Sequence, residues 1–179
     1  DFTIKVVWVA ASVERKQVRE EAKAELSPFQ KEESYTLGIS SNTVILKADT
    51  LHGLFNGFQT LRQLLLTNPM YKVEGHDGIL LPCMEIIDWP ALSIRGVADD
   101  VSRGQIPTVE SAKEFIRDIS RFKNNYYALY MEDVFACSKH PKIGKDRGAF
   151  TARELQEIDD YAKSRFVTLF PILETLTHW

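Results

Sequence analysis

The sequence contains few cysteines. Cys83 and Cys137 are the only two among 179 residues, and neither has a second cysteine at CxxC spacing. Two cysteines are too few for the disulfide framework of a small secreted domain, and their spacing gives no redox or zinc-thiolate motif. We interpret both as free thiols and expect Cys83 to be buried.

The sequence also lacks an excess of charge of either sign and any long apolar run. With 22 basic and 25 acidic residues the formal net charge is -3, so nucleic acid and anionic membrane surfaces are not expected partners. No apolar run approaches the length that spans a bilayer. The first residues, DFTIKVVWVA, lack the basic lead and cleavage site of a signal peptide. We expect a cytosolic protein or one whose export segment has been removed.

The first half of the chain has the pattern of a small α+β domain. Apolar and polar residues alternate in YTLGISSNTVILKAD around a polar turn, which predicts a β-hairpin. We also expect a strand at residues 3–10, a mostly exposed helix at 12–26 and a strand in CMEIIDWP, ended by Pro90. A helix capped by Thr50 carries a wide apolar stripe that must lie on the sheet. This domain is expected to span residues 1–90.

From residue 91 the pattern changes to strand, helix, strand, helix, strand. The strands are LSIRGVA, YYALYM and FVTLFPIL, and Thr151 with Glu154 predicts a capping box for the second helix. Strands separated by helices imply parallel pairing through right-handed crossovers. Polar residues follow each strand, where parallel α/β folds place their ligand sites: Asp99 and Asp100, then Glu132 and Asp133, then Glu174 and His178.

The second half is too short for a closed barrel. A (β/α)8 barrel of the TIM type takes about 250 residues, whereas the sequence ends at residue 179, directly after its third strand. We therefore expect residues 91–179 to be an incomplete barrel, its first three β/α units, from a longer protein. Open strand edges invite association, so self-association through those edges is predicted.

Four segments follow one another along the chain: ESYTLGISSNTVILKADTLHGLFNGFQTLRQLL, IIDWPALSIRGVADDVSRGQIP, FKNNYYALYMEDVF and PILETLTHW. In this order they resemble the family-20 glycoside hydrolases, the β-N-acetylhexosaminidases. The second is similar to the family pattern D-x-P-R-F-x-x-R-G-x-x-x-D-x-x-R-H, with Arg95, Gly96, Asp100 and Arg103 in register. Gly104, Ala91 and the pair Leu176-Thr177 depart from the family pattern, which indicates a divergent subgroup.

The resemblance implies retaining hydrolysis of terminal β-linked N-acetylhexosamine, with the substrate's own acetamido oxygen as nucleophile. The family's adjacent Asp-Glu pair follows the fourth barrel strand, beyond Trp179, so we expect no catalytic residue in this chain and no activity of the fragment alone. The family needs no cofactor or metal, and the implied partners are N-acetylhexosamine-containing glycans. It also implies a secreted, periplasmic or cell-surface location if an export segment has been removed.

The same resemblance implies roles for the strand-end residues. Arg95 matches an arginine that grips sugar hydroxyls, and Glu174 takes the acidic position of the third strand end. Glu132 or Asp133, with His178, would sit behind the general acid and tune its proton affinity. Asp100 and Arg103 would hold the loop at the barrel mouth.

Simpler interpretations stay open for several of these residues. Arg95 could form a buried ion pair with Asp100, either member of the Glu132–Asp133 doublet could face the site, and Trp179 could pack or stack on a sugar. His76 and His140 are most simply surface histidines.

Two other functions remain open at this stage. One is another glycosidase that shares the leading domain, and the other is a non-catalytic carbohydrate-binding or scaffold module.

Overall fold

The computed structural model describes residues 3–8, 25–67 and 81–174. The chain forms two units, Asp1–Ser93 and Ile94–Trp179. The expected helix at residues 12–26 lies almost entirely outside the described residues, as does the loop that contains His76. His178 and Trp179 also lie outside them.

The first unit contains a four-stranded sheet with the order β1-β3-β2-β4. The predicted hairpin is confirmed, because β2 (Tyr35–Ile39) pairs antiparallel with β3 (Thr43–Ala48). β1 (Thr3–Trp8) runs parallel to β3. β4 (Met84–Asp88) pairs antiparallel with β2 on its other side, so the strand predicted in CMEIIDWP is also confirmed.

The α3 helix (Leu51–Thr67) packs on this sheet against β2 and β3. Its first turn is capped as expected, because the Gly53 amide donates to Thr50 Oγ1 at 2.9 Å. The alternate side chains of both hairpin strands are buried beneath the helix. The core comprises Tyr35, Leu37, Ile39, Val44, Leu46, Ala48, Leu54 and Leu61.

The sequence pattern did not predict α2 (Pro28–Glu33), a helix of six residues. Ser27 precedes it, and the Ser27 amide donates to the Gln30 side chain at 3.0 Å. The Gln30 amide group in turn donates to the carbonyl of Pro90 at 3.1 Å, which ties α2 to the segment after β4. Cys83, immediately before β4, is exposed, so the expectation that it is buried is wrong.

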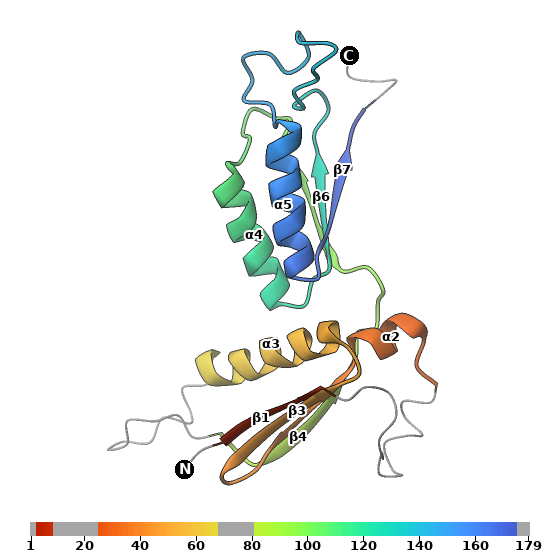
Figure 1. Ribbon diagram of the computed structural model, residues 1–179, viewed down its shortest axis with the longest axis vertical. Coiled ribbons are helices and arrows are strands. Elements are labelled where there is room, and N and C mark those ends of the chain that lie inside the picture. Colours follow the sequence, from red (N-terminus) through yellow and green to blue (C-terminus); the bar gives the residue numbers. More distant parts are fainter. Residues whose placement is uncertain (1–2, 9–24, 68–80, 175–179) are drawn as a thin grey trace, which may run out of the picture. The chain divides into compact units, whose positions relative to one another are not determined.

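The second unit contains three parallel strands in the order β5-β6-β7, as the sequence pattern predicts. They are β5 (Gly96–Asp100), β6 (Tyr126–Tyr130) and β7 (Thr168–Ile172). The connecting helices α4 (Val109–Arg121) and α5 (Ala152–Ser164) lie side by side on one face of this sheet (Figure 1). The predicted capping box of Thr151 and Glu154 at the start of α5 is confirmed.

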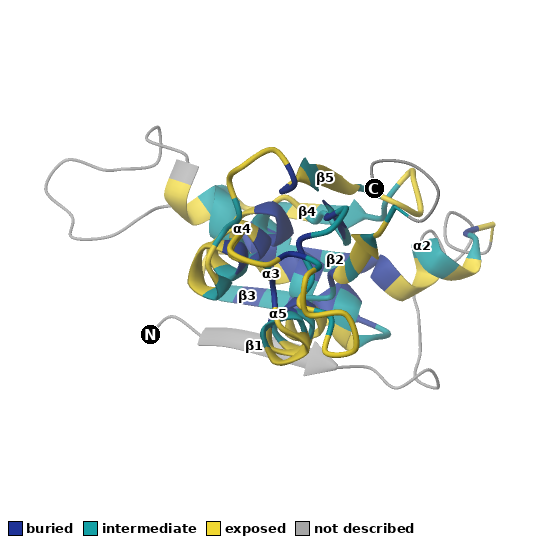
Figure 2. Cartoon of the chain, turned by 90° about the horizontal axis from the view of Figure 1, so that it is seen from above, coloured by how far each residue is buried: buried dark blue, intermediate teal, exposed yellow. Residues whose placement is uncertain are grey.

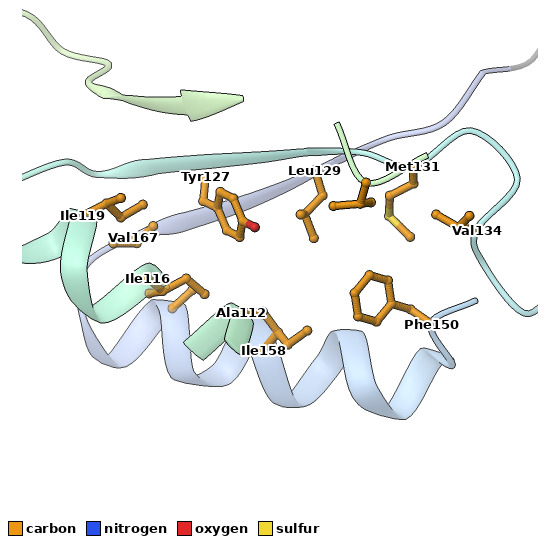
Figure 3. Packing of buried hydrophobic residues seen from close by; sticks show 12 residues of the cluster. Ala112, Ile116, Ile119, Tyr127, Leu129, Met131, Val134, Phe150, Ile158 and Val167 are labelled. Atoms are coloured by element: carbon orange, nitrogen blue, oxygen red, sulfur yellow. The ribbon is translucent and has the colours of Figure 1, made fainter. Parts of the chain in front are cut away.

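The core of this unit lies between the sheet and the two helices. Tyr127 and Leu129 of β6 point toward Ile116 of α4 and Ile158 of α5 (Figure 3). Because side chains alternate along a strand, Tyr126, Ala128 and Tyr130 occupy the other face. There the Tyr126 ring stacks on Phe170, which is 48% exposed, with ring centroids 5.5 Å apart. Most residues of β5 are exposed as well (Figure 2).

Candidate functional site

The carboxyl ends of β5 and β6 bring one cation and two carboxylates together. The strands pair in register, with Asp100 opposite Tyr130. In the loop after β5, the Arg103 guanidinium lies 3.3 Å from Asp100 through Nε and 2.8 Å from Glu132 Oε1 through Nη1. We name Asp100, Arg103, Tyr130, Glu132 and Glu174 the Arg103 cluster.

Glu132 adopts an unusual backbone conformation at this point. Its φ is 49°, in the left-handed region that non-glycine residues adopt at a cost of roughly 1–2 kcal/mol. Its side chain is only 9% exposed, and the Arg103 contact balances the charge of this largely buried carboxylate. Backbone strain of this kind concentrates at functional sites, which makes Glu132 the main candidate of the doublet.

Tyr130 connects the ends of β6 and β7. The carboxylates of Glu174 and Glu132 both act on its hydroxyl. Desolvation, followed by these two carboxylates, raises the pKa of Tyr130 to about 12, so the phenol remains a hydrogen-bond donor at neutral pH. The Arg103 guanidinium also lies 6.0 Å from the centroid of the Tyr130 ring.

Sequence reasoning missed Tyr130, because the last tyrosine of YYALYM reads as a core residue. The signal that could have found it is its position: it lies on the face opposite the core, directly before the polar strand end.

Asp100 holds the loop after β5. The Ser102 amide and hydroxyl both donate to Asp100 Oδ1, at 3.0 and 2.6 Å. The Ser102 hydroxyl bond is the main reason that the pKa of Asp100 is lowered, and Arg103 contributes as well. The neighbouring Asp99 instead accepts from the Tyr127 hydroxyl at 3.0 Å. The two aspartates therefore have separate roles.

Asp133 and Glu132 have different ion-pair partners. The Arg147 guanidinium donates to Asp133 Oδ1 and, through Nη2, to the carbonyl of Ser102 at 2.9 Å. The structure therefore places Glu132 in the Arg103 cluster and Asp133 against the loop at residues 134–150.

Arg95 lies at the opposite end of the sheet from this cluster. It precedes the first residue of β5, and its side chain donates through Nε and Nη2 to the carbonyl of Lys123, at 3.0 and 2.9 Å. The five residues of β5 separate it from the carboxyl end by about 16 Å, at about 3.3 Å per residue. The alternative of a buried pair with Asp100 is therefore wrong, whereas the sugar-binding role of Arg95 stays a prediction.

The described residues form no group of three or more histidine, cysteine, aspartate or glutamate side chains that could hold a metal ion. Within the same part of the chain, no helix combines the length and the apolar character needed to cross a membrane.

Comparison with known proteins gives consistent matches. The family model described as glycosyl hydrolase family 20, domain 2, matches residues 3–89. A β-hexosaminidase of Porphyromonas gingivalis is 32% identical over 168 residues, which cover 83% of this chain and 21% of that protein. A β-hexosaminidase of Emericella nidulans is 28% identical over 160 residues, covering 82% of this chain and 25% of the relative.

Solved structures extend the similarity into the second unit. The N-acetyl-β-hexosaminidase of Streptomyces plicatus, in complex with Thio-NAglucal, aligns with a TM-score of 0.69 and 28% identity over 94% of this chain and 33% of that chain. The chitobiase of Flavobacterium johnsoniae aligns with a TM-score of 0.68 and 27% identity over 78% of this chain and 21% of its own. The chain thus spans between a fifth and a third of these proteins.

Proposed function

Because the chain belongs to glycosyl hydrolase family 20, whose domain 2 matches residues 3–89, we propose that it is the leading part of a β-hexosaminidase that removes terminal β-linked N-acetylhexosamine. The observation that carries the proposal is the Arg103 cluster. It gathers an arginine, a tyrosine and carboxylates at the end of a parallel sheet where such folds bind ligands.

We propose two domains, residues 1–90 and residues 91–179, the second being the first three β/α units of a (β/α)8 barrel. Three parallel strands with both helices on one face support this assignment. In a barrel the face opposite the helices is the interior, and here that face carries Tyr130 and the stacked rings of Tyr126 and Phe170.

Within this site, Arg103 is the better candidate for binding sugar hydroxyls. Its side chain is 58% exposed, and the two ion pairs use only Nε and Nη1. A planar guanidinium held by carboxylates presents its remaining donors in a fixed orientation. Arg95, by contrast, is engaged by Lys123 at the other end of the sheet. We therefore propose Arg103 in place of Arg95 for sugar binding, together with Glu174 after the end of β7.

The reaction needs a carboxylic acid that protonates the leaving oxygen and a carboxylate that orients the acetamido group. In the proposed enzyme the Asp-Glu pair that performs these tasks follows a later strand, and Glu132 and His178 support the general acid. The 179-residue chain is accordingly proposed to be inactive alone, and the reaction requires no cofactor.

The test compares this chain with the longer protein that contains it. We expect the longer protein to release 4-nitrophenol from the β-N-acetylglucosaminide or β-N-acetylgalactosaminide, and the 179-residue chain to release none. Proton NMR of the first sugar product should show the β-anomer, because the mechanism retains configuration. A longer protein that hydrolyses neither substrate, or gives the α-anomer first, would contradict the proposal.

A further inference from the structure

The loop after β6 carries a concentration of positive charge. Residues 137–147, named here the basic loop, contain four basic side chains and one acidic, Asp146, in a chain whose net charge is -3. The four are Lys139, Lys142, Lys145 and Arg147, and all are exposed, as is His140. Such a segment attracts anions if its charges are held in place and not neutralised by neighbours.

The ends of this loop are fixed to the body of the second unit. Phe135 and Phe150 form an isolated β-bridge, in which the Phe150 amide donates to the carbonyl of Val134 at 3.0 Å. Gly144 has a φ of 68°, and a Cβ atom there would lie 2.7 Å from the carbonyl oxygen of Asp133. The loop lies beyond the carboxyl end of β6 (Figure 1). The basic loop is therefore anchored to the second unit, at the same edge of the sheet as the Arg103 cluster.

The neighbouring charges at this edge are already engaged with one another. Arg103 pairs with Glu132 and Asp100, and Arg147 pairs with Asp133. Among the described residues, in contrast, no carboxylate lies within 4.0 Å of the ammonium groups of the remaining basic side chains, Lys139, Lys142 and Lys145. Three lysine charges are therefore available for a ligand.

The basic loop is linked to the Arg103 cluster at the ends of both β5 and β6. Arg147 contacts Ser102, which adjoins Arg103, and Asp133, which adjoins Glu132. A glycan whose terminal sugar is bound by Arg103 would thus have the basic loop at the same edge of the sheet.

We propose that the basic loop is a subsite for a negatively charged group, a carboxylate or a sulfate ester, on the glycan unit next to the terminal N-acetylhexosamine. The inference rests on the proposed function and adds a substrate class to it, namely acidic glycans. Exposed lysines interact with anions mainly by screened Coulomb attraction, so the preference should weaken strongly with salt.

The test titrates three oligosaccharides into the isotopically labelled 179-residue chain and follows backbone amide shifts by NMR. One has N-acetylglucosamine alternating with glucuronate, one is an N-acetylglucosamine oligomer with sulfate esters, and one is the neutral oligomer. We expect a charged oligosaccharide to shift amides of residues 137–147 at 50 mM salt, and these shifts to be largely lost at 300 mM. The more effective of the two charged ligands identifies the anion.

A triple variant, Lys139→Gln with Lys142→Gln and Lys145→Gln, should weaken binding of the charged oligosaccharide about tenfold at low salt. The matched control, Lys31→Gln with Lys47→Gln and Lys163→Gln, removes the same charge from other surfaces and should change affinity less than twofold. The inference would be overturned if the neutral oligomer or a single-stranded oligonucleotide bound as tightly as the charged oligosaccharide. It would also be overturned if the control variant lost as much affinity, or if no amide of the loop shifted. Hydrolysis of the uncharged 4-nitrophenyl substrate by the longer protein tests the proposed function separately, because that substrate offers the loop no anion.

Discussion

Arg147 bonds simultaneously to Asp133 and to the carbonyl of Ser102, and so joins the loops that follow β5 and β6. The residues next to these two partners are Glu132 and Arg103, which form the ion pair of the candidate site. The Arg147 guanidinium thus binds one member of the acidic doublet and leaves the other to pair with Arg103. With Asp133 held by Arg147, the left-handed backbone of Glu132 directs the other carboxylate to Arg103.

The Arg147→Gln variant should loosen the loop without unfolding the unit. Both partners are partly exposed, so the ion pair contributes only about 0–1 kcal/mol to the free energy of unfolding. Local opening is more sensitive, and we expect amide hydrogen exchange to accelerate across residues 134–150. Arg153→Gln, which removes an exposed arginine of α5, is the control and should leave that exchange unchanged. Unchanged exchange in the Arg147 variant would show that the loop is held by the Phe135–Phe150 bridge alone.

Substituting each arginine by lysine separates the two candidates for sugar binding. In the longer enzyme, Arg103→Lys should lower kcat/KM by about 100-fold or more, since lysine cannot reproduce the fork of donors and misplacement of substrate is costly. Arg95→Lys should have a much smaller effect, because Arg95 bonds to a backbone carbonyl at the other end of the sheet. Steady-state kinetics on both 4-nitrophenyl substrates measures the difference. A larger loss in the Arg95 variant would return the sugar-binding role to that residue.

The sequence pattern predicted the strands and the longer helices because their apolar periodicity is strong. β2 and β3 alternate cleanly, and the capping box of α5 is encoded by two residues three apart. The six-residue α2 was missed because it is too short to show a period, and its stability comes from contacts such as the bond from Gln30 to the carbonyl of Pro90.

The candidate site was only partly predictable for a different reason. Parallel pairing indicates which strand ends meet, so Glu132, Asp100 and Glu174 could be anticipated. A motif does not state where a strand begins: the predicted strand LSIRGVA includes Arg95, whereas β5 starts one residue after it. The division of labour between Glu132 and Asp133 depends on Arg147, fourteen residues along the chain, and no local pattern contains it.

Gly96 is required by the close approach of β5 to β6. A Cβ atom at this position would lie 2.0 Å from the carbonyl oxygen of Tyr126, a backbone atom that cannot move aside independently. We expect Gly96→Ala to lower the free energy of unfolding by about 3 kcal/mol. The control is Gly38→Ala in β2, where the nearest atom would be 3.9 Å away and the change should be close to neutral. Denaturant unfolding of both variants gives the comparison, and similar stabilities would contradict the predicted clash.

Tyr35, which is buried, and Asp88, which is partly exposed, form a polar contact in the first unit. The Tyr35 hydroxyl donates to Asp88 Oδ2 at 2.7 Å and lies 2.6 Å from Thr60 Oγ1, while the residue is only 1% exposed. Burial raises the pKa of Tyr35, so the hydroxyl stays protonated. Tyr35→Phe should cost about 1 kcal/mol, because the hydrogen bond to the partly buried Asp88 carboxylate is lost. In a double-mutant cycle with Asp88→Asn, additive losses would show that the two side chains are not coupled.

The capping box of α5 should make the free energy of unfolding depend on pH in the acid range. The Thr151 amide and hydroxyl both donate to Glu154 Oε2 at 2.8 Å, and these bonds, the amide first, lower the pKa of Glu154 from its usual 4.5. A carboxylate whose pKa is lower in the folded state stabilises that state above its unfolded pKa, and the contribution disappears as pH falls through the folded pKa. Glu154→Gln should therefore be less stable than the wild type at pH 7, and the difference should shrink as the pH falls below 4.5. Glu110→Gln, in the first turn of α4, is the control, because it removes a first-turn carboxylate outside any capping box. If both variants lose the same stability at pH 7, the helix dipole rather than the Thr151 contacts explains the effect.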